Sequence, residues 1–240
     1  TAVAGNGDID GDGTMDVVVS APSAADTLGV KNIGKVTVIY GCKPVNCVPI
    51  TADLYGSIGQ PKDSWGAALA LGDIDSDGHA DVIVGAPKAM DSQLEKPLKQ
   101  AGCVFAYSGQ SLNQTMPIFA ACGATASAHA GTAVAVGDFN GAGGKEIVVG
   151  APNDDATNDD GKKLADAGSV SIYTYGSTMP LYTQYGKAAK DYFGKAVAAG
   201  GDVNNDGVND VLAGVPGLDN PIAKLKDVGG FVVLYGSNSN

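Results

Sequence analysis

The sequence predicts an all-β fold: a β-propeller built of four blades, each a four-stranded antiparallel sheet. An acidic motif that begins at Asp8 returns at Asp73, Asp138 and Asp202, at intervals of 65, 65 and 64 residues. A run of small residues precedes each copy of the motif, and a β-branched run follows it. Repeats at a fixed interval indicate stacked units that share one core.

The four repeats are expected to form a single array over residues 1–240, with approximate bounds 1–56, 64–123, 130–186 and 192–240. The small-residue runs, at 1–4, 66–71, 131–136 and 194–199, are the expected first strands. Ala and Gly suit the crowded centre of a propeller, where large side chains of adjacent blades would collide. Residues 193–200 are Ala-rich enough for a helix, but the acidic turn that ends all four runs favours strands.

The remaining strands follow in the same order in each repeat. The β-branched runs at 17–22, 82–87, 147–152 and 211–216 are too short for helices and end in Pro. Their unbroken apolar character indicates central strands that are buried on both faces. After a long polar loop, alternating third strands are expected at 34–41, 102–107, 168–173 and 230–236. Weaker fourth strands at 49–55, 117–120 and 180–185 begin with Pro, which suits an outer edge.

The last blade is expected to lack its outer strand, because no fourth strand follows residue 236. Two interpretations stay open. The sequence is an excerpt of a longer propeller, or copies of the chain complete one another head-to-tail through open blade edges. The second arrangement would give an extracellular ring or filament.

Composition excludes some classes of function. The formal net charge is −11, Arg does not occur, and Glu95 and Glu146 are the only glutamates. The chain lacks the basic patches that nucleic-acid binding needs. It also lacks the roughly 18 consecutive apolar residues of a membrane span. An acidic fraction made almost entirely of Asp favours turns and metal loops over solvated helices.

Three elements in a fixed order resemble the FG-GAP repeat. They are an aromatic-Gly pair (Trp65-Gly66, Phe193-Gly194), the acidic loop, and a Gly-Ala-Pro tripeptide (Gly85-Ala86-Pro87, Gly150-Ala151-Pro152). The resemblance covers essentially the whole chain. It implies the propeller fold of the N-terminal region of integrin α subunits. Family propellers typically have seven blades, whereas this chain holds four repeats.

The resemblance also has local departures. Repeat 3 has Ala130 where the aromatic residue of the pair is expected. Ser20 replaces the Gly of the tripeptide in repeat 1, and Val215 replaces the Ala in repeat 4.

The resemblance implies about three Ca²⁺ sites, with ligands from positions 1, 3, 5 and 9 of each loop and the carbonyl at position 7. The implied ligands are Asp8, Asp10, Asp12, Thr14 and Asp16; Asp73, Asp75, Asp77, His79 and Asp81; and Asp202, Asn204, Asp206, Val208 and Asp210. Oxygen ligands suit Ca²⁺ better than Zn²⁺. The alternative is that these loops are metal-free Asx turns. Four converging carboxylates would then repel one another without compensation.

Repeat 3 is expected to hold a weak or empty site. Its remaining oxygen ligands are Asp138, Asn140 and Glu146. Ala142 removes the oxygen at position 5, and Lys145 adds a positive charge nearby.

The four cysteines are expected to form the disulfides Cys42–Cys47 and Cys103–Cys122, because each pair ties neighbouring strands of one repeat. The alternative is four buried free thiols. Disulfides together with calcium loops fit an extracellular or cell-surface location.

No catalytic set is visible. His79 lies inside an acidic loop, and His129 is interpreted as a turn or packing residue. Neither a Gly-x-Ser-x-Gly motif nor a phosphate-binding glycine loop occurs. A further acidic group, Asp154, Asp155, Asp159 and Asp160, forms either another cation site or a solvated loop.

We therefore expect a non-enzymatic, calcium-binding extracellular module for adhesion or recognition of a protein or glycan ligand. A self-assembling structural subunit is the alternative, and an accessory domain of a secreted hydrolase is a remote one. The long loops at 23–34, 88–101, 153–167 and 217–229 are expected to share one face, as binding loops often do.

Overall fold

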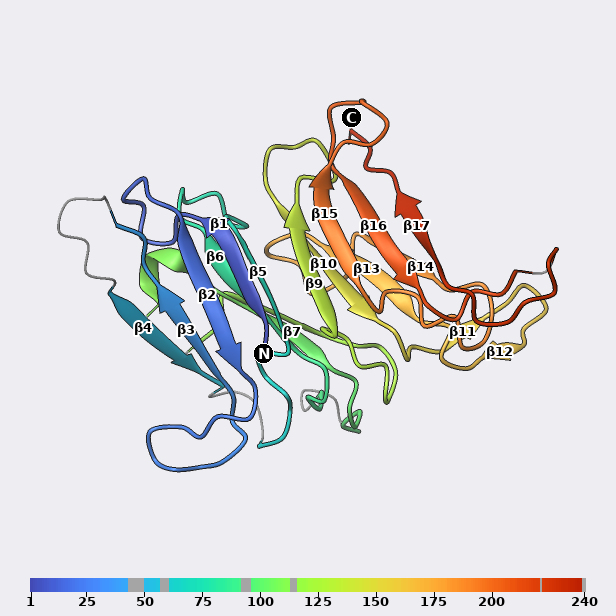
Figure 1. Cartoon of the computed structure of the whole chain (residues 1–240), viewed down its shortest axis with the longest axis horizontal. Coiled ribbons are helices and arrows are strands. Elements are labelled where there is room, and N and C mark those ends of the chain that lie inside the picture. The colour runs from blue at the N-terminus through green and yellow to red at the C-terminus, as the bar shows by residue number, and fades with distance from the viewer. Residues whose placement is uncertain (43–49, 57–60, 92–95, 113–115, 221, 239–240) are drawn as a thin grey trace.

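The computed structural model describes the chain except for residues 43–49, 57–60, 92–95, 113–115, 221 and 239–240. Four antiparallel sheets follow one another along the chain (Figure 1). Sheet 1 contains β1 (Val3–Gly7), β2 (Asp16–Ala21), β3 (Lys35–Ile39) and β4 (Thr51–Tyr55). Sheet 2 contains β5 (Ala68–Gly72), β6 (Asp81–Ala86), β7 (Cys103–Tyr107) and β8 (Phe119–Cys122). Sheet 3 contains β9 (Ala133–Gly137), β10 (Glu146–Ala151), β13 (Ser169–Tyr173) and β14 (Tyr182–Tyr185). Sheet 4 contains β15 (Val197–Gly201), β16 (Asp210–Val215) and β17 (Gly230–Leu234).

Each sheet is a meander in which successive strands are hydrogen-bonded neighbours. The first strands lie next to one another in chain order, because β1 contacts β5, β5 contacts β9, and β9 contacts β15. The sheets therefore stack face against face with their first strands gathered together. This confirms the all-β prediction and the four-stranded antiparallel sheets. It also shows residues 197–201 to be a strand and not a helix.

The second strands begin and end within one residue of their predicted bounds, whereas β5, β9 and β15 begin two or three residues late. The glycines that precede them, Gly66, Gly131 and Gly194, have φ angles of 88°, 80° and 82°. This left-handed conformation makes a turn, in which the N–H of Ala67 donates to the carbonyl of Ser64 at 3.0 Å. The ladder can form only after that turn.

Two short elements were not predicted. A two-stranded sheet of β11 (Ala156–Thr157) and β12 (Lys163–Leu164) lies within the long loop of repeat 3. A 3₁₀ helix, η1 (Gly109–Ser111), follows β7.

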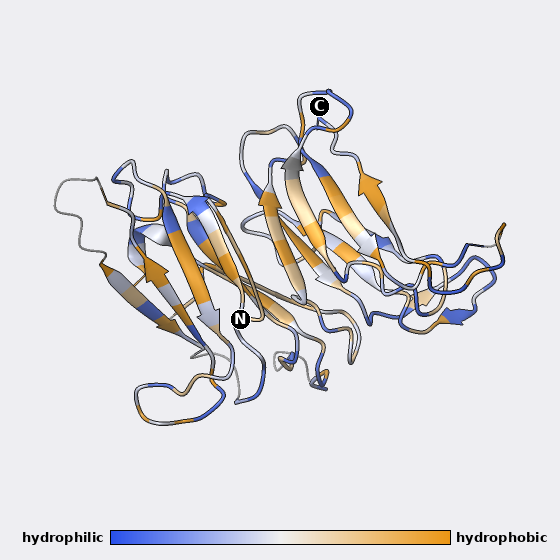
Figure 2. Ribbon diagram, viewed as in Figure 1, coloured by the Kyte–Doolittle hydropathy of each residue, from blue (hydrophilic) through white to orange (hydrophobic). Residues whose placement is uncertain are grey.

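The hydrophobic core has three layers, one between each pair of adjacent sheets. Val18, Val36 and Val38 of sheet 1 pack against sheet 2. Ile83, Val104 and Ala106 of sheet 2 pack against sheet 3, and Val148, Val170 and Ile172 of sheet 3 pack against sheet 4. Figure 2 shows this apolar character along the strands, with hydrophilic residues concentrated in the loops. The second strands of sheets 2 and 3, β6 and β10, are buried on both faces, as their unbroken apolar runs predicted. For β2 and β16 the prediction was wrong, because each is exposed on one face, where no further sheet of the described chain covers it.

The glycines of the FG-GAP-like motif let adjacent sheets approach closely. A Cβ atom on Gly85 would overlap the carbonyl oxygen of Gly131 in the next sheet, and one on Gly150 would overlap that of Gly194. The tripeptide glycines of sheets 2 and 3 therefore pack against the left-handed Gly turn of the next sheet, which leaves no room for a side chain at Gly85 or Gly150. In sheet 1 the equivalent position holds Ser20, which is buried and accepts from the N–H of Ala2 at 2.8 Å.

Cys103 and Cys122 form a disulfide that joins β7 to β8. The other expected pair, Cys42–Cys47, lies outside the described residues, because 43–49 are not described.

Candidate metal sites

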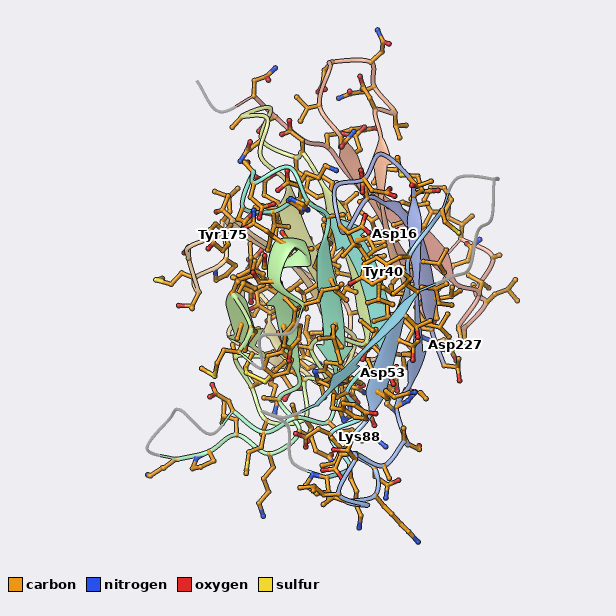
Figure 3. The ribbon with its side chains drawn as sticks, turned by 90° about the vertical axis from the view of Figure 1, so that its left-hand side faces the viewer. Asp16, Tyr40, Asp53, Lys88, Tyr175 and Asp227 are labelled. Carbon is orange, nitrogen blue, oxygen red and sulfur yellow. A yellow bond between two sulfur atoms is a disulfide. The ribbon has the colours of Figure 1, made fainter. Side chains whose placement is uncertain are left out.

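The four acidic loops connect the first and second strands of the sheets. We name them loop 1 (Asp8–Asp16), loop 2 (Asp73–Asp81), loop 3 (Asp138–Glu146) and loop 4 (Asp202–Asp210). All four lie at the upper end of the molecule in Figure 1, and the long loops that follow the second strands lie toward the lower end. In Figure 3, Asp16 and Tyr40 lie toward the upper end of sheet 1 and Lys88 lies at the opposite end. The acidic loops and the long loops thus occupy opposite ends of the sheets.

The first aspartate of each complete loop closes the turn by accepting two backbone hydrogen bonds. Asp8 accepts from the N–H groups of Asp12 (3.1 Å) and Gly13 (2.9 Å). Asp73 accepts from Asp77 and Gly78 at 3.1 and 3.0 Å, and Asp202 accepts from Asp206 and Gly207 at 3.0 and 2.8 Å. Loops 1, 2 and 4 therefore share one backbone conformation.

The carboxylate at position 9 ties each loop to its sheet. Asp16 accepts from the N–H of Ile9 (2.6 Å) and from that of Gly41 (2.7 Å), just beyond β3. Asp81 makes the equivalent bonds to Ile74 and Gly109, and Asp210 makes them to Val203 and Gly236. All three aspartates are buried, whereas the carboxylates at position 5 are exposed.

Carboxylate oxygens converge in two of the loops. In loop 1, oxygens of Asp8, Asp10 and Asp16 all lie within 4.8 Å of one another, and in loop 2 those of Asp73, Asp75 and Asp77 do. Asp12 and Asp81 stand outside these groups. No such group of three carboxylates occurs in loop 4, all of whose residues are described. There Asn204 occupies position 3, and its amide donates to Asp206 at 2.8 Å.

Because these carboxylates lie close together, each is harder to ionise when no cation is bound. Burial raises the pKa of Asp10 and Asp75, and neighbouring carboxylates raise each of them further. Burial raises the pKa of Asp81 to about 6, against the hydrogen bonds from Ile74 and Gly109 that lower it. A cation bound in the loop would relieve both costs.

Loop 3 has a different arrangement. The side chain of Asn140 donates to Glu146 at 2.6 Å, and the N–H of Phe139 donates to the other oxygen of the same carboxylate at 2.8 Å. Asp138 accepts from Gly141 at 2.7 Å, one residue earlier than the corresponding bond in the other loops. In loop 3 the carboxylate at position 9 therefore accepts from a side-chain amide as well as from a backbone N–H.

Contacts between neighbouring loops were not foreseen from the sequence. The N–H of Ala80 in loop 2 donates to the carbonyl of Asp8 in loop 1 at 2.8 Å, and His79 Nδ1 lies 3.1 Å from the carbonyl oxygen of Ile9. Asn209 in loop 4 donates to the carbonyl of Asp138 in loop 3 at 2.9 Å. A one-dimensional pattern holds no signal for these pairs, because they depend on how adjacent sheets stack.

Two members of the acidic group in the long loop of repeat 3, Asp154 and Asp155, make structural contacts. Asp154 is buried and accepts from Thr125 (2.5 Å) and Ser169 (2.8 Å). Asp155 pairs with Lys163 at 2.6 Å, and this hydrogen bond lowers its pKa. His129, the other histidine, lies 2.9 Å from Asn153 in a turn with φ of 57°. These contacts indicate structural roles.

Comparison with known proteins agrees with this geometry. The FG-GAP repeat model matches residues 2–39, 65–102 and 193–235, which span the first three strands of sheets 1 and 4 and the first two of sheet 2.

The chain is an FG-GAP repeat protein.

Integrin α subunits are among its relatives. The chain is 30% identical over 193 residues to integrin alpha pat-2 of Caenorhabditis elegans, which covers 76% of this chain and 15% of that protein. It is 32% identical over 157 residues to human integrin alpha-6, which covers 63% and 12%. It is 29% identical over 226 residues to integrin alpha-V of Gallus gallus, which covers 90% and 20%. The chain thus spans a small part of each relative's length.

A solved rhamnogalacturonan lyase from Bacillus licheniformis aligns with 88% of this chain and 42% of its own, at 15% identity and a TM-score of 0.38. This likeness is too low to support an argument about fold or activity. Within the described residues, none of the helices is both long and apolar enough to cross a membrane.

Proposed function

We propose that this FG-GAP array is a non-enzymatic β-propeller module that binds Ca²⁺ at loops 1, 2 and 4 and recognises an extracellular protein or glycan in adhesion. The observation that carries the calcium part is the backbone turn that loops 1, 2 and 4 share, with carboxylate oxygens brought together in loops 1 and 2. The donor set fits Ca²⁺, because all side-chain donors are oxygens and the loops allow the irregular, high coordination that Ca²⁺ takes.

The residues at positions 1, 3, 5 and 9 and the carbonyl at position 7 would hold the ion. The aspartate at position 9 would connect the ion to its sheet, because the same carboxylate accepts backbone bonds from positions before β2 and after β3. Bound Ca²⁺ would therefore stiffen the β1–β2 hairpin and its counterparts. Loop 3 is proposed to stay weak or empty, since the Asn140 amide already satisfies Glu146.

Calcium titration with thermal unfolding tests this part. We expect about three ions per chain by isothermal titration calorimetry. Because an ion that binds only the folded state stabilises it by mass action, the melting temperature should fall on chelation and recover with added Ca²⁺. Identical melting curves in calcium and in chelator would reject calcium as a structural ligand.

The recognition part rests on the integrin relatives and on the fold, which gathers four long loops at the end opposite the acidic loops. Loops carried by a rigid sheet scaffold often form binding surfaces. A cell-surface or extracellular location would also suit the Cys103–Cys122 disulfide. An array of extracellular matrix proteins and glycans, probed with the calcium-loaded chain, tests this part. Absence of saturable binding to any of them would count against an adhesion role.

A further inference from the structure

Position 7 of each acidic loop from loop 2 onward lies against position 4 of the loop before it. The three pairs are His79 with Gly11, Gly144 with Ser76, and Val208 with Gly141. A Cβ built on the glycine of each pair would come within 2.6, 3.8 and 3.4 Å of its partner, in that order. The stacking of the sheets thus repeats one contact between neighbouring loops, and of the three residues at position 7 only His79 has a polar side chain.

The imidazole of His79 reaches the backbone of loop 1. Its Nδ1 lies 3.1 Å from the carbonyl oxygen of Ile9. A carbonyl oxygen only accepts hydrogen bonds, so Nδ1 carries the hydrogen in this contact. The ring also covers Gly11, where a Cβ would lie 2.6 Å from its Cε1 atom. Glycine at position 4 of loop 1 therefore leaves the space that the ring occupies.

Ile9 stands between two of the proposed calcium ligands. Its carbonyl belongs to the peptide group that joins it to Asp10, and its N–H donates to Asp16 at 2.6 Å. The preceding peptide group is held as well, because the carbonyl of Asp8 accepts from the N–H of Ala80 in loop 2 at 2.8 Å. Loop 2 thus holds the backbone that carries the carboxylates of Asp8 and Asp10, whose oxygens come together in loop 1.

His79 is itself held within loop 2. Its N–H donates to Asp77 at 2.8 Å, and its carbonyl is a ligand of the site proposed there. Its side chain is half-buried and borders, with Asp10, a cavity of about 440 Å³. Removing the ring would therefore leave no sealed void in the core, and variants at this position should fold.

The other two contacts between loops lack such a bond, although the structure describes every residue of loops 2, 3 and 4. Gly144 has no side chain to offer loop 2. The methyl groups of Val208 pack against loop 3 and cannot donate a hydrogen bond. Loop 1 is thus the one acidic loop that receives a side-chain hydrogen bond from position 7 of its neighbour.

We propose that His79 is a positioning residue for the calcium site of loop 1, although it belongs to loop 2. Its bond to the Ile9 carbonyl holds Asp8 and Asp10 in place, so less order has to be imposed on them when the ion binds. The proposal rests on the calcium function proposed for these loops. It makes the calcium affinity of loop 1 depend on a side chain that is not a ligand of that site.

Calorimetric titration of full chains that keep one complete site tests the proposal. Asp75→Ala with Asp206→Ala leaves loop 1 as the complete site, and one ion should bind. Adding His79→Ala should weaken this binding about 10-fold, as for other groups that orient metal ligands. His79→Asn should restore most of the affinity, because its amide nitrogen can take the place of Nδ1 and donate to the same carbonyl.

Two controls separate positioning from a general loss of structure. Asp12→Ala with Asp206→Ala leaves loop 2 as the complete site. There His79→Ala should not change the calcium affinity, because residue 79 supplies only its backbone carbonyl to that site. Val208→Ala shortens the side chain at the same position of loop 4, and it should leave the affinity of loop 1 unchanged.

The outcomes distinguish this proposal from the calcium function on which it rests. If loop 1 binds no ion even with His79 intact, the calcium function itself fails, and this proposal fails with it. If one ion binds with equal affinity before and after His79→Ala, only the role of His79 is overturned. Equal weakening of loops 1 and 2, or no recovery with His79→Asn, would also overturn that role.

Discussion

Glu146 shows how a single methylene group changes an acidic loop. The aspartates at this position in the other loops accept one hydrogen bond from a backbone N–H within the loop and one from an N–H just after the third strand. Glu146 keeps the bond from Phe139, but its longer side chain reaches the amide of Asn140. The neutral amide of Asn140 thus stabilises the negative charge of Glu146, which a bound cation would otherwise compensate.

Replacing Asp77, an exposed residue of the proposed site in loop 2, by Ala should remove one calcium site. We expect isothermal titration calorimetry to give one fewer ion per chain for Asp77→Ala than for the wild type. Asp138→Asn in loop 3 is the matched control and should leave the number of bound ions unchanged. Loss of an ion in the control would mean that loop 3 is occupied after all.

Asp81 should make the metal-free protein less stable as pH rises through the range between its two pKa values. Burial raises its pKa from 3.8 to about 6 in the folded chain. Between these pH values the unfolded chain has released the proton and the folded chain still holds it. The free energy of unfolding therefore falls with rising pH, by up to about 3 kcal/mol from this group.

The comparison that isolates this effect is wild type against Asp81→Asn in calcium-free buffer. From pH 4 to pH 7, urea unfolding should show the wild type losing more stability than the variant. With saturating Ca²⁺ the wild type should show the opposite trend, since the ion binds the ionised carboxylate. Equal pH dependence of the two proteins without calcium would contradict the prediction.

Candidate ligands could be predicted from the sequence because they are neighbours along the chain. Asp8, Asp10 and Asp16 come together through one tight turn, and that turn is encoded locally by Asp and Gly. The contact between Ala80 and Asp8 could not be predicted, because it depends on the distance and register between two sheets. The amide–carboxylate bond in loop 3 depends on side-chain rotamers, which a residue pattern does not specify.

At the scale of the element, the glycines of the tripeptide set how closely two sheets can stack. Gly150 is the fifth of the six residues of the buried strand β10, where a glycine is otherwise costly. A Cβ there would overlap the carbonyl oxygen of Gly194. Backbone atoms cannot rotate away as a side chain can, so the two sheets would have to move apart.

Gly150→Ala should therefore lower the free energy of unfolding by about 1–3 kcal/mol, the range typical of overpacking in a core. Gly214→Ala is the matched control, because the equivalent space is open and its nearest neighbour is 3.7 Å away. Urea unfolding of the two variants at low protein concentration should show a large loss of stability for Gly150→Ala only. Equal losses would mean that strand propensity, and not stacking distance, explains these glycines.

The late start of the first strands illustrates the limit of pattern reading at this scale. The small-residue runs correctly indicate β5, β9 and β15, but their glycines take a left-handed conformation that delays the ladder. The hairpin of β11 and β12 has two residues in each strand, too few for any alternation to be visible. Strand identity was thus predictable where a periodic run of several residues exists.

At the scale of the whole molecule, the interval of 65, 65 and 64 residues predicted how many sheets form and in which order. The orientation of the acidic loops follows from this repeat, because every sheet begins with a strand that runs in the same sense. The packing between sheets follows less directly. Each sheet packs through the side chains that share a face with Val18 or its counterparts. Which residues share that face is known only from the pairing registers of the strands.

Repulsion between like charges acts on the molecule as a whole. The formal charge is −11, and the acidic loops gather at one end of the sheets. Three calcium ions would offset about half of this charge.

Without calcium, added sodium chloride should therefore raise the melting temperature by screening the repulsion between the carboxylates. With saturating calcium, the same salt should have a smaller effect. The measurement is a pair of salt titrations of the dilute protein followed by thermal unfolding. Salt shifts of equal size in the two series would show that repulsion between the loops does not limit the stability of the metal-free fold.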